Sequence, residues 1–154
     1  MKLTFCWIIL LALAPLYPLP GATEDKSLVG LTAVEVLVED LPMGAAKLGL
    51  TKEALQTDIE LKLRLAGMRI IAPIGAEVLY VAVNVASDGR AANIAIELDQ
   101  SARLDRDPTI WVPSASTWSK DIIVTNPTAQ GIRNQIKDQV DVFLNAWLSV
   151  NPKK

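Results

Sequence analysis

The sequence contains no histidine and a single cysteine, Cys6, which lies in the apolar N-terminal stretch. Without histidine, His-based general acid–base catalysis and Ser–His–Asp triads are excluded. Without a second cysteine, a disulfide within the chain is excluded, and thiol catalysis or a Cys/His zinc site is excluded for the part of the chain after Cys6. No G-x-G-x-x-G or Walker loop occurs either. The sequence therefore predicts no cofactor and no metal site, and it favours a protein that is not an enzyme.

The chain also lacks a block of basic residues. It has 15 Lys and Arg against 17 Asp and Glu, a formal net charge of −2, and both signs are mixed along the sequence. Such a surface does not concentrate the positive potential that attracts phosphate backbones. We therefore expect no nucleic-acid partner.

The N-terminal segment has the layout of a secretory signal peptide. Lys2 precedes an unbroken apolar run over residues 5–14, prolines follow at positions 15, 18 and 20, and Gly21-Ala22 supplies small residues before the first acidic ones. We predict cleavage after Ala22 and export to the periplasm or the extracellular space. The alternative is that the uncharged stretch 5–22 is retained as a membrane anchor, although its prolines disfavour a continuous spanning helix.

The rest of the chain has the size of one ordinary domain. Our predicted organisation is a signal peptide over residues 1–22, a leader over 23–30, a single domain over 31–150 and a tail over 151–154. We expect no membrane insertion of the mature domain unless the N-terminal segment is retained.

The first part of the domain predicts a strand followed by a loop. Alternation over residues 31–39 places Val34, Val36 and Val38 on one face of a strand. Residues 41–50 include a proline and two glycines, and we predict a loop there.

A helix is predicted over residues 52–66, with Thr51 as its N-cap and Gly67 as the left-handed residue that ends it. An amphipathic stripe is expected from Leu55, Ile59 and Leu63, widened by Leu61 and Leu65. A short apolar strand follows over 68–72. Strand, helix, glycine and strand in this order are typical of a crossover unit between parallel strands.

The clearest local signal is a β-hairpin. Two alternating runs flank Asp88-Gly89, a pair suited to a type I′ turn, and a two-residue turn fixes the register outward from Ser87 opposite Arg90. One face then consists of apolar pairs: Val85 with Ala92, Val83 with Ile94, Val81 with Ile96, and Leu79 with Leu98. The other face pairs Ala86 with Ala91, Asn84 with Asn93, Ala82 with Ala95, Tyr80 with Glu97, and Val78 with Asp99.

The next part of the chain predicts weaker strands. The charged stretch 103–107 is expected to leave the sheet, and residues 110–112, between Pro108 and Pro113, to form a short edge segment. Residues 118–124 are expected to form the last strand.

A long amphipathic helix is predicted after Asn126-Pro127-Thr128. Its apolar residues share one face: Ile132, Ile136, Val140, Phe143, Leu144 and Trp147. We therefore predict an α+β fold of two layers, a mostly antiparallel sheet of four to five strands with both helices packed on the apolar face of the hairpin.

The opposite face of the hairpin is the candidate binding surface. It carries Tyr80, Asn84, Asn93 and Glu97, with alanines between them that leave room for a ligand. The alternative is an ordinary hydrated sheet face. We predict an exported module that binds another envelope protein or a glycan through this face or through a free strand edge.

Two rival functions stay open. Glu97 and Asp99 lie two residues apart on one strand, about 7 Å apart from the rise per residue, and such a carboxylate pair would suit an inverting glycan hydrolase. A purely structural role is the other alternative. Trp111 and Trp118 are each either core residues or surface residues that stack on a ligand, and Asp105 with Asp107 lacks the further ligands of an EF-hand calcium site.

Two segments, LTKEALQTDIELKL at 50–63 and NAWLSVNP at 145–152, resemble a group of small bacterial secreted proteins without an assigned function. The resemblance implies bacterial export and supplies no catalytic or binding residues. The order of the predicted elements is also similar to that of small envelope-assembly domains such as the TolB N-terminal and CsgG-like folds, a likeness of layout that does not establish function.

Overall fold

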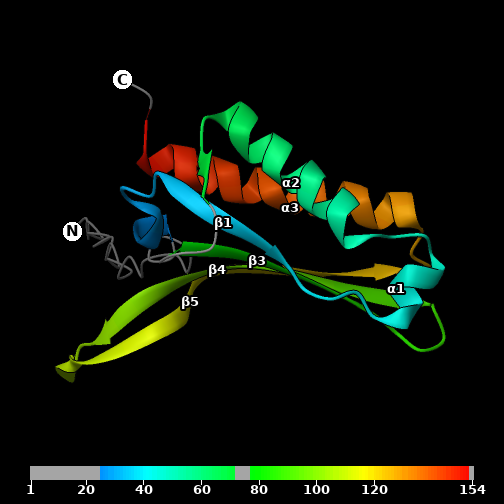
Figure 1. Cartoon of the computed structure of the whole chain (residues 1–154), viewed down its shortest axis with the longest axis horizontal. Helices are drawn as coiled ribbons and strands as arrows, with labels where there is room; N and C mark the ends of the chain where they lie inside the picture. The colour runs from blue at the N-terminus through cyan, green and yellow to red at the C-terminus, as the bar shows by residue number, and fades with distance from the viewer. Residues whose placement is uncertain (1–24, 72–76, 153–154) are drawn as a thin grey trace, which may run out of the picture.

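A computed structural model describes residues 25–71 and 77–152. Its elements in chain order are η1 (Asp25–Leu28), β1 (Ala33–Val38), α1 (Met43–Lys47), α2 (Lys52–Ala66), β2 (Arg69–Ile70), β3 (Glu77–Val85), β4 (Ala91–Leu104), β5 (Asp107–Thr125) and α3 (Ala129–Val150) (Figure 1). The predicted signal segment, its cleavage after Ala22 and the last residue of the predicted strand 68–72 lie outside the described residues.

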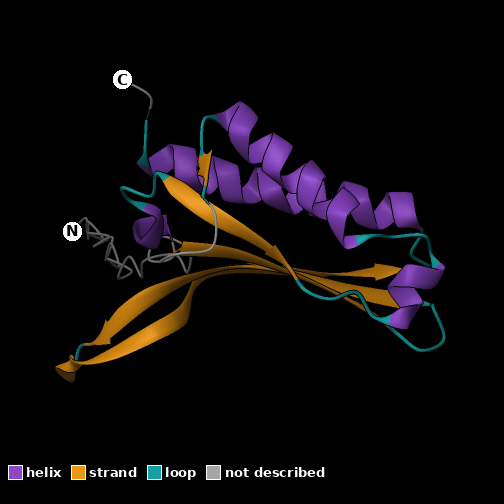
Figure 2. Ribbon diagram, viewed as in Figure 1, coloured by secondary structure: helices purple, strands orange, loops and turns teal. Residues whose placement is uncertain are grey.

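The sheet has five strands in the order β2-β1-β3-β4-β5. Strand β1 is parallel to β2 and β3, as the predicted crossover unit requires for β1 and β2, while β3, β4 and β5 pair antiparallel. Helices α2 and α3 lie side by side on one face of the sheet (Figure 2). The predicted α+β class, with a mostly antiparallel sheet covered by two helices on one face, is confirmed.

The core lies between the two helices and the apolar face of the hairpin. Val81, Val83, Ile94 and Ile96 are all buried there, as the alternation predicts. Trp118 of β5 meets Phe143 of α3 edge to face, with ring centroids 5.1 Å apart. The described helices include none that is long and apolar enough to span a membrane.

The hairpin register is confirmed, but the predicted turn type is wrong. Pairs from Val85 with Ala92 to Val78 with Asp99 match the prediction. A type I′ turn needs positive φ at both central residues, yet of these two only Gly89 has it, at 70°. Gly89 N donates to Ala86 O at 2.8 Å, so the loop is longer. The predicted two-residue loop and the longer observed loop are both centred on Asp88-Gly89, so they give the two strands the same register.

The helix ends follow their predicted caps. Thr51 Oγ1 accepts a hydrogen bond from Ala54 N, and Gly67 ends α2 with φ at 96°. Thr128 Oγ1 accepts from Gly131 N at 3.0 Å and starts α3. These side chains satisfy backbone groups that have no partner within the helix.

Three ion pairs join α2 to α3, one of them between Lys62 and Asp141 at 2.6 Å. Asp58 of α2 lies 2.8 Å from Arg133 and 3.3 Å from Lys137 of α3. Desolvation acts to raise the pKa of Asp58, but the hydrogen bonds and charges of Arg133 and Lys137 outweigh it together and hold the pKa below its usual value.

The described ends of the chain are tied together. The side chain of Asn151 accepts a hydrogen bond from Gly30 N and donates one to Leu28 O, both at 2.8 Å. Leu28 is fully buried. Residues just before β1 therefore pack into the domain.

The largest departure from the sequence prediction is a two-stranded arm. Residues 103–107 do not leave the sheet: β4 runs to Leu104, and β5 is one strand from Asp107 that includes both Pro108 and Pro113. Pairing of β4 with β3 ends at Gln100, so residues 101–115, here called the arm, form a ribbon that projects from the body (Figure 1). Prolines are tolerated because β5 is an edge strand, where a missing N–H breaks no ladder.

Two smaller predictions also fail. The segment 41–50 is not all loop, because α1 forms within it, and Gly44 lets this helix approach β3: a Cβ at Gly44 would lie 3.1 Å from Val85 Cβ. Leu61 and Leu65 do not widen the core stripe of α2. They are 54% and 77% exposed, since the sheet and α3 cover a narrower arc of the helix than the leucines span.

Candidate functional site

The four predicted site residues lie together on the face of the sheet that α2 and α3 leave uncovered. Tyr80 is opposite Glu97 and Asn84 is opposite Asn93 in the β3–β4 ladder. Asn84 is exposed, and the other three are half-buried. Ala82 opposite Ala95 separates the two pairs. We call this surface the open face.

Neighbouring strands extend the open face beyond what the hairpin sequence reveals. Leu37 of β1 is in register with Tyr80, and Glu39 follows on the same side. On β5, Ser119 lies opposite Glu97, Asp121 opposite Ala95, and Ile123 opposite Asn93. Alternation within β1 and β5 was readable from the sequence, but which strands lie beside the hairpin was not.

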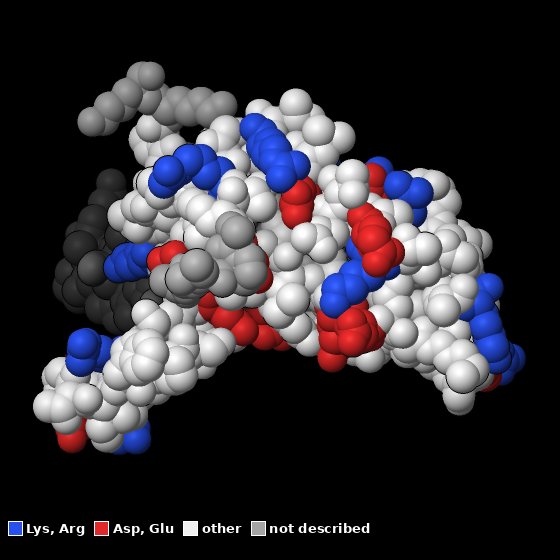
Figure 3. Space-filling view, in the orientation of Figure 1, with Lys and Arg blue, Asp and Glu red and all other residues white. Residues whose placement is uncertain are grey.

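The open face is acidic. Glu39, Glu97, Asp99 and Asp121 point to it, and no Lys or Arg does so from the described positions of β1, β3, β4 up to Asp99 or β5 from Ser119 onward. Acidic side chains are visible along the lower edge of the body, below the helices (Figure 3). Carboxylates gathered without basic partners attract positive charge and repel anions.

The pKa of Tyr80 reflects this acidic environment. Desolvation of the phenol raises its pKa above the usual value, and its hydrogen bond to Glu39 and the charges of Glu39, Glu97 and Asp99 raise it further. The hydroxyl therefore stays protonated at neutral pH. It is a hydrogen-bond donor directed at the carboxylate of Glu39.

A hollow lies at one end of the open face. Its volume is about 320 Å³, and it is lined by Asn84, Asn93 and Ile123 together with the adjacent hairpin residues Val85, Ala86, Ala91 and Ala92. A second cavity, of about 450 Å³, lies between α1 and the hairpin turn, where Met43, Leu48 and Val85 line it. The hollow of about 320 Å³ is the one lined by two predicted site residues, Asn84 and Asn93.

The carboxylate pair of the rival hydrolase hypothesis lies outside the cavities described above. Neither Glu97 nor Asp99 lines the two cavities above or a third near Glu35 and Arg64. Asp99 Oδ2 accepts a hydrogen bond from Ser114 Oγ at 3.2 Å. The described geometry therefore does not favour an enclosed site for bond cleavage at this pair.

Asp107 is engaged by local hydrogen bonds at the start of β5. Asp107 Oδ1 accepts hydrogen bonds from the hydroxyl and the backbone N–H of Thr109, at 2.6 and 3.0 Å, and these bonds lower the pKa of Asp107. Among the described residues, no group of three or more acidic side chains is placed to hold an ion.

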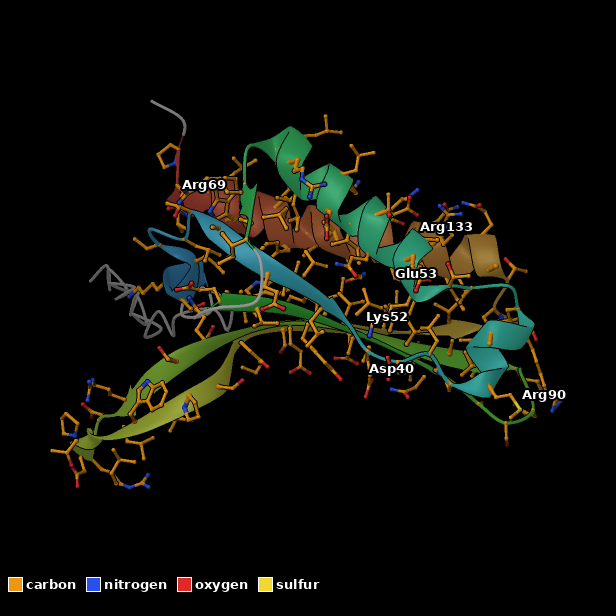
Figure 4. All side chains as sticks on the ribbon, in the orientation of Figure 1. Asp40, Lys52, Glu53, Arg69, Arg90 and Arg133 are labelled. Atoms are coloured by element: carbon orange, nitrogen blue, oxygen red, sulfur yellow. The ribbon has the colours of Figure 1, made fainter. Side chains whose placement is uncertain are left out.

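One charged pair lies near the edge of the site. Lys52, at the start of α2, points toward Asp40 and donates a hydrogen bond to it at 2.8 Å (Figure 4). This hydrogen bond and the charge of Lys52 lower the pKa of Asp40. The pair links the end of β1 to α2 and is not part of the open face.

The two tryptophans left open by the sequence have different environments. Trp118 is a core residue, 2% exposed, while Trp111 on the arm is 58% exposed. Trp147 is buried, as predicted, and its Nε1–H donates to Leu31 O at 2.8 Å. Trp111 is thus the tryptophan that is accessible among the described residues.

No protein-family model matches the chain, and no curated protein sequence is significantly similar to it. The predicted resemblance to a family of exported bacterial proteins thus stays a prediction.

Three solved structures are similar to this chain over about three quarters of its length. A variant of PelC from Paraburkholderia phytofirmans, crystallised as a dodecamer, is 17% identical, with a TM-score of 0.38 over 75% of this chain and 82% of PelC. A minor lipoprotein from Acinetobacter baumannii is 10% identical, with a TM-score of 0.33 over 76% and 90%. The rare lipoprotein B of Shewanella oneidensis is 13% identical, with a TM-score of 0.30 over 77% and 96%. Likeness at this level assigns the chain no function.

Proposed function

We propose that this protein is an exported, non-enzymatic module that binds a component of the cell envelope through its open face. The observation that carries the proposal is the placement of Tyr80, Asn84, Asn93 and Glu97 on a rigid sheet face that neither α2 nor α3 covers. The predicted signal segment supports the export.

The chemistry of the face supports a partner that donates hydrogen bonds. Carboxylates accept hydrogen bonds but cannot donate them when ionised, and each asparagine side chain both donates and accepts. Glu39, Glu97, Asp99 and Asp121 meet no basic side chain from β1, β3, β4 up to Asp99 or β5 from Ser119 onward, so a partner surface with donors or positive charge is favoured there.

Site-specific photocrosslinking tests the proposal. A photoreactive amino acid replaces exposed Ser119, which is on the open face opposite Glu97. The protein is exported in cells, irradiated and analysed by mass. We expect a discrete adduct that is lost when Tyr80→Ala and Asn84→Ala are added, because both changes remove contact groups without touching the buried core.

Glu53 supplies the matched control. It is exposed on α2, away from the sheet, so a photoreactive group there should give no such adduct. Equal labelling from Glu53, or no adduct from Ser119, would contradict the proposal. Circular dichroism of the alanine variants must show unchanged folding.

A further inference from the structure

The open face continues from the body onto the arm. At the register shifts beside the arm, Leu98 pairs with Trp118 and Asp99 with Ser116, and then Gln100 pairs with Ala115 and Ala102 with Val112. The extra residues therefore belong to β5, and the alternation of β4 is unbroken. It places Arg103 on the same side as Asp99, and Trp111 is the cross-strand partner of Arg103.

The base of the arm is fixed by side-chain hydrogen bonds. Thr117, the extra residue of the first shift, has its Oγ1 3.2 Å from Leu98 O and 2.7 Å from Gln100 Oε1. Bulges of this kind bend a strand. The arm accordingly bends away from the helix layer, and the outline of the molecule is concave on the open-face side (Figures 1 and 3).

Trp111 and the hollow at Asn84 and Asn93 thus lie toward opposite ends of one long surface. The β4 residues Asn93 and Arg103 mark these ends, about 30 Å apart along the strand from the rise per residue. Tyr80, Glu97 and Asp99 lie between them. An extended chain fits such a surface better than a single small molecule does.

Composition favours a glycan over a protein on this surface. The centres of protein–protein interfaces are depleted of Glu, Asp, Ser and Ala. At the centre of this face, residues of these four types, Glu97, Asp99, Ser119 and Ala95, outnumber Tyr80 and Leu37. Carboxylate and amide oxygens accept hydrogen bonds from hydroxyl groups. An exposed indole offers a flat apolar face, with one polar edge, on which a sugar ring can stack.

We infer that the surface from the Asn84–Asn93 hollow to Trp111 binds an extended glycan without acidic groups, and that Trp111 is a stacking platform for one of its rings. Acidic sugars are disfavoured because the carboxylates Glu39, Glu97, Asp99 and Asp121 outnumber Arg103 on this surface and repel anions. The inference rests on the proposed function and names the partner class of the same face.

Titration with a neutral hexamer of N-acetylglucosamine tests the inference. The exported protein is titrated by calorimetry and by tryptophan fluorescence. We expect binding that Trp111→Ala weakens by roughly tenfold, within the range that a stacked aromatic contact contributes. The matched control is Leu65→Ala, which removes another exposed apolar side chain, on the outer side of α2, and should leave the dissociation constant unchanged. Hexagalacturonate, an acidic glycan, should not bind.

Absence of hexamer binding, an unchanged dissociation constant in Trp111→Ala, or equal binding of hexagalacturonate would each overturn the inference. The crosslink from Ser119 separates this failure from failure of the proposed function. An adduct that contains sugar supports the inference. A peptide adduct overturns it and leaves the proposed function standing, whereas no adduct removes both.

Discussion

Strands β4 and β5 run through both the body of the sheet and the arm, but the two parts are stabilised differently. In the body, β4 and β5 have helices on one face, and residues such as Ile96 and Trp118 are buried. In the arm, the two strands pair only with each other among the described residues, and Ile110 and Trp111 are 42% and 58% exposed. A two-stranded ribbon alone is marginally stable in water. The arm therefore has exposed apolar side chains, Trp111 among them, that the stability of the fold does not require.

The largest expected effect compares the two tryptophans of β5. Trp118→Ala removes a buried ring that packs on Phe143, and such core truncations cost about 3–5 kcal/mol. Trp111→Ala should change the free energy of unfolding by less than about 0.5 kcal/mol, as exposed substitutions do. Urea unfolding measures both values. Equal losses would show that the arm is covered and that the contrast between body and arm is wrong.

A second, smaller effect tests the helix layer that distinguishes the body. Asp58→Asn weakens the hydrogen bonds of Arg133 and Lys137 to residue 58, and we expect a loss of about 1.5–3 kcal/mol at neutral pH, the range for hydrogen bonds to charged groups.

The pH dependence of the Asp58 effect has a defined sign. Because the folded pKa of Asp58 lies below its usual 3.8, the pair stabilises the fold above that value, and the contribution is lost as the pH falls through the folded pKa. The stability gap between wild type and Asp58→Asn should therefore shrink as the pH falls below about 3.8. A gap that is constant across this range would exclude the ion pairs as its cause.

The smallest expected effects are at the hairpin turn and test the corrected turn type. Gly89→Ala should cost about 1 kcal/mol, because an L-residue is strained at the left-handed φ, while no atom obstructs the added methyl group. Asp88→Gly should also destabilise slightly, since Asp88 Oδ1 accepts a hydrogen bond from Arg90 N and glycine adds unfolded-state entropy. Thermal unfolding of both variants measures these changes in stability. Stabilisation by Asp88→Gly would instead indicate the type I′ turn.

Local signals predicted the hairpin and the two long helices, but they did not predict α1 or the arm. Val83 and Asn84 have their predicted faces because alternation and a loop centred on Asp88-Gly89 act over a few residues. Pro108 and Pro113 were interpreted as strand ends, and an edge strand removes that constraint only once its place in the sheet is known. Leu61 and Leu65 show the same limit for a helix, since the width of its covered face depends on its neighbours.

The candidate site was predicted in part for the same reason. Tyr80, Asn84, Asn93 and Glu97 come from one hairpin, so sequence alone brings them together. Glu39 and Trp111 join them through the parallel pairing of β1 with β3 and through the long β4–β5 ladder. Neither pairing has a signature within the chain segments concerned, because both depend on contacts between distant strands.

Thiol reactivity at two adjacent positions tests most directly whether one face of the sheet is sealed and the other open. In a Cys6→Ser background no other cysteine is present, so Val83→Cys and Asn84→Cys can be labelled one at a time with a maleimide under native conditions. We expect Asn84→Cys to react at nearly the rate of a free thiol and Val83→Cys to react only after unfolding, because Val83 is 2% exposed beneath the helices. Protection of the thiol at position 84, or equal rates at both positions, would contradict the account.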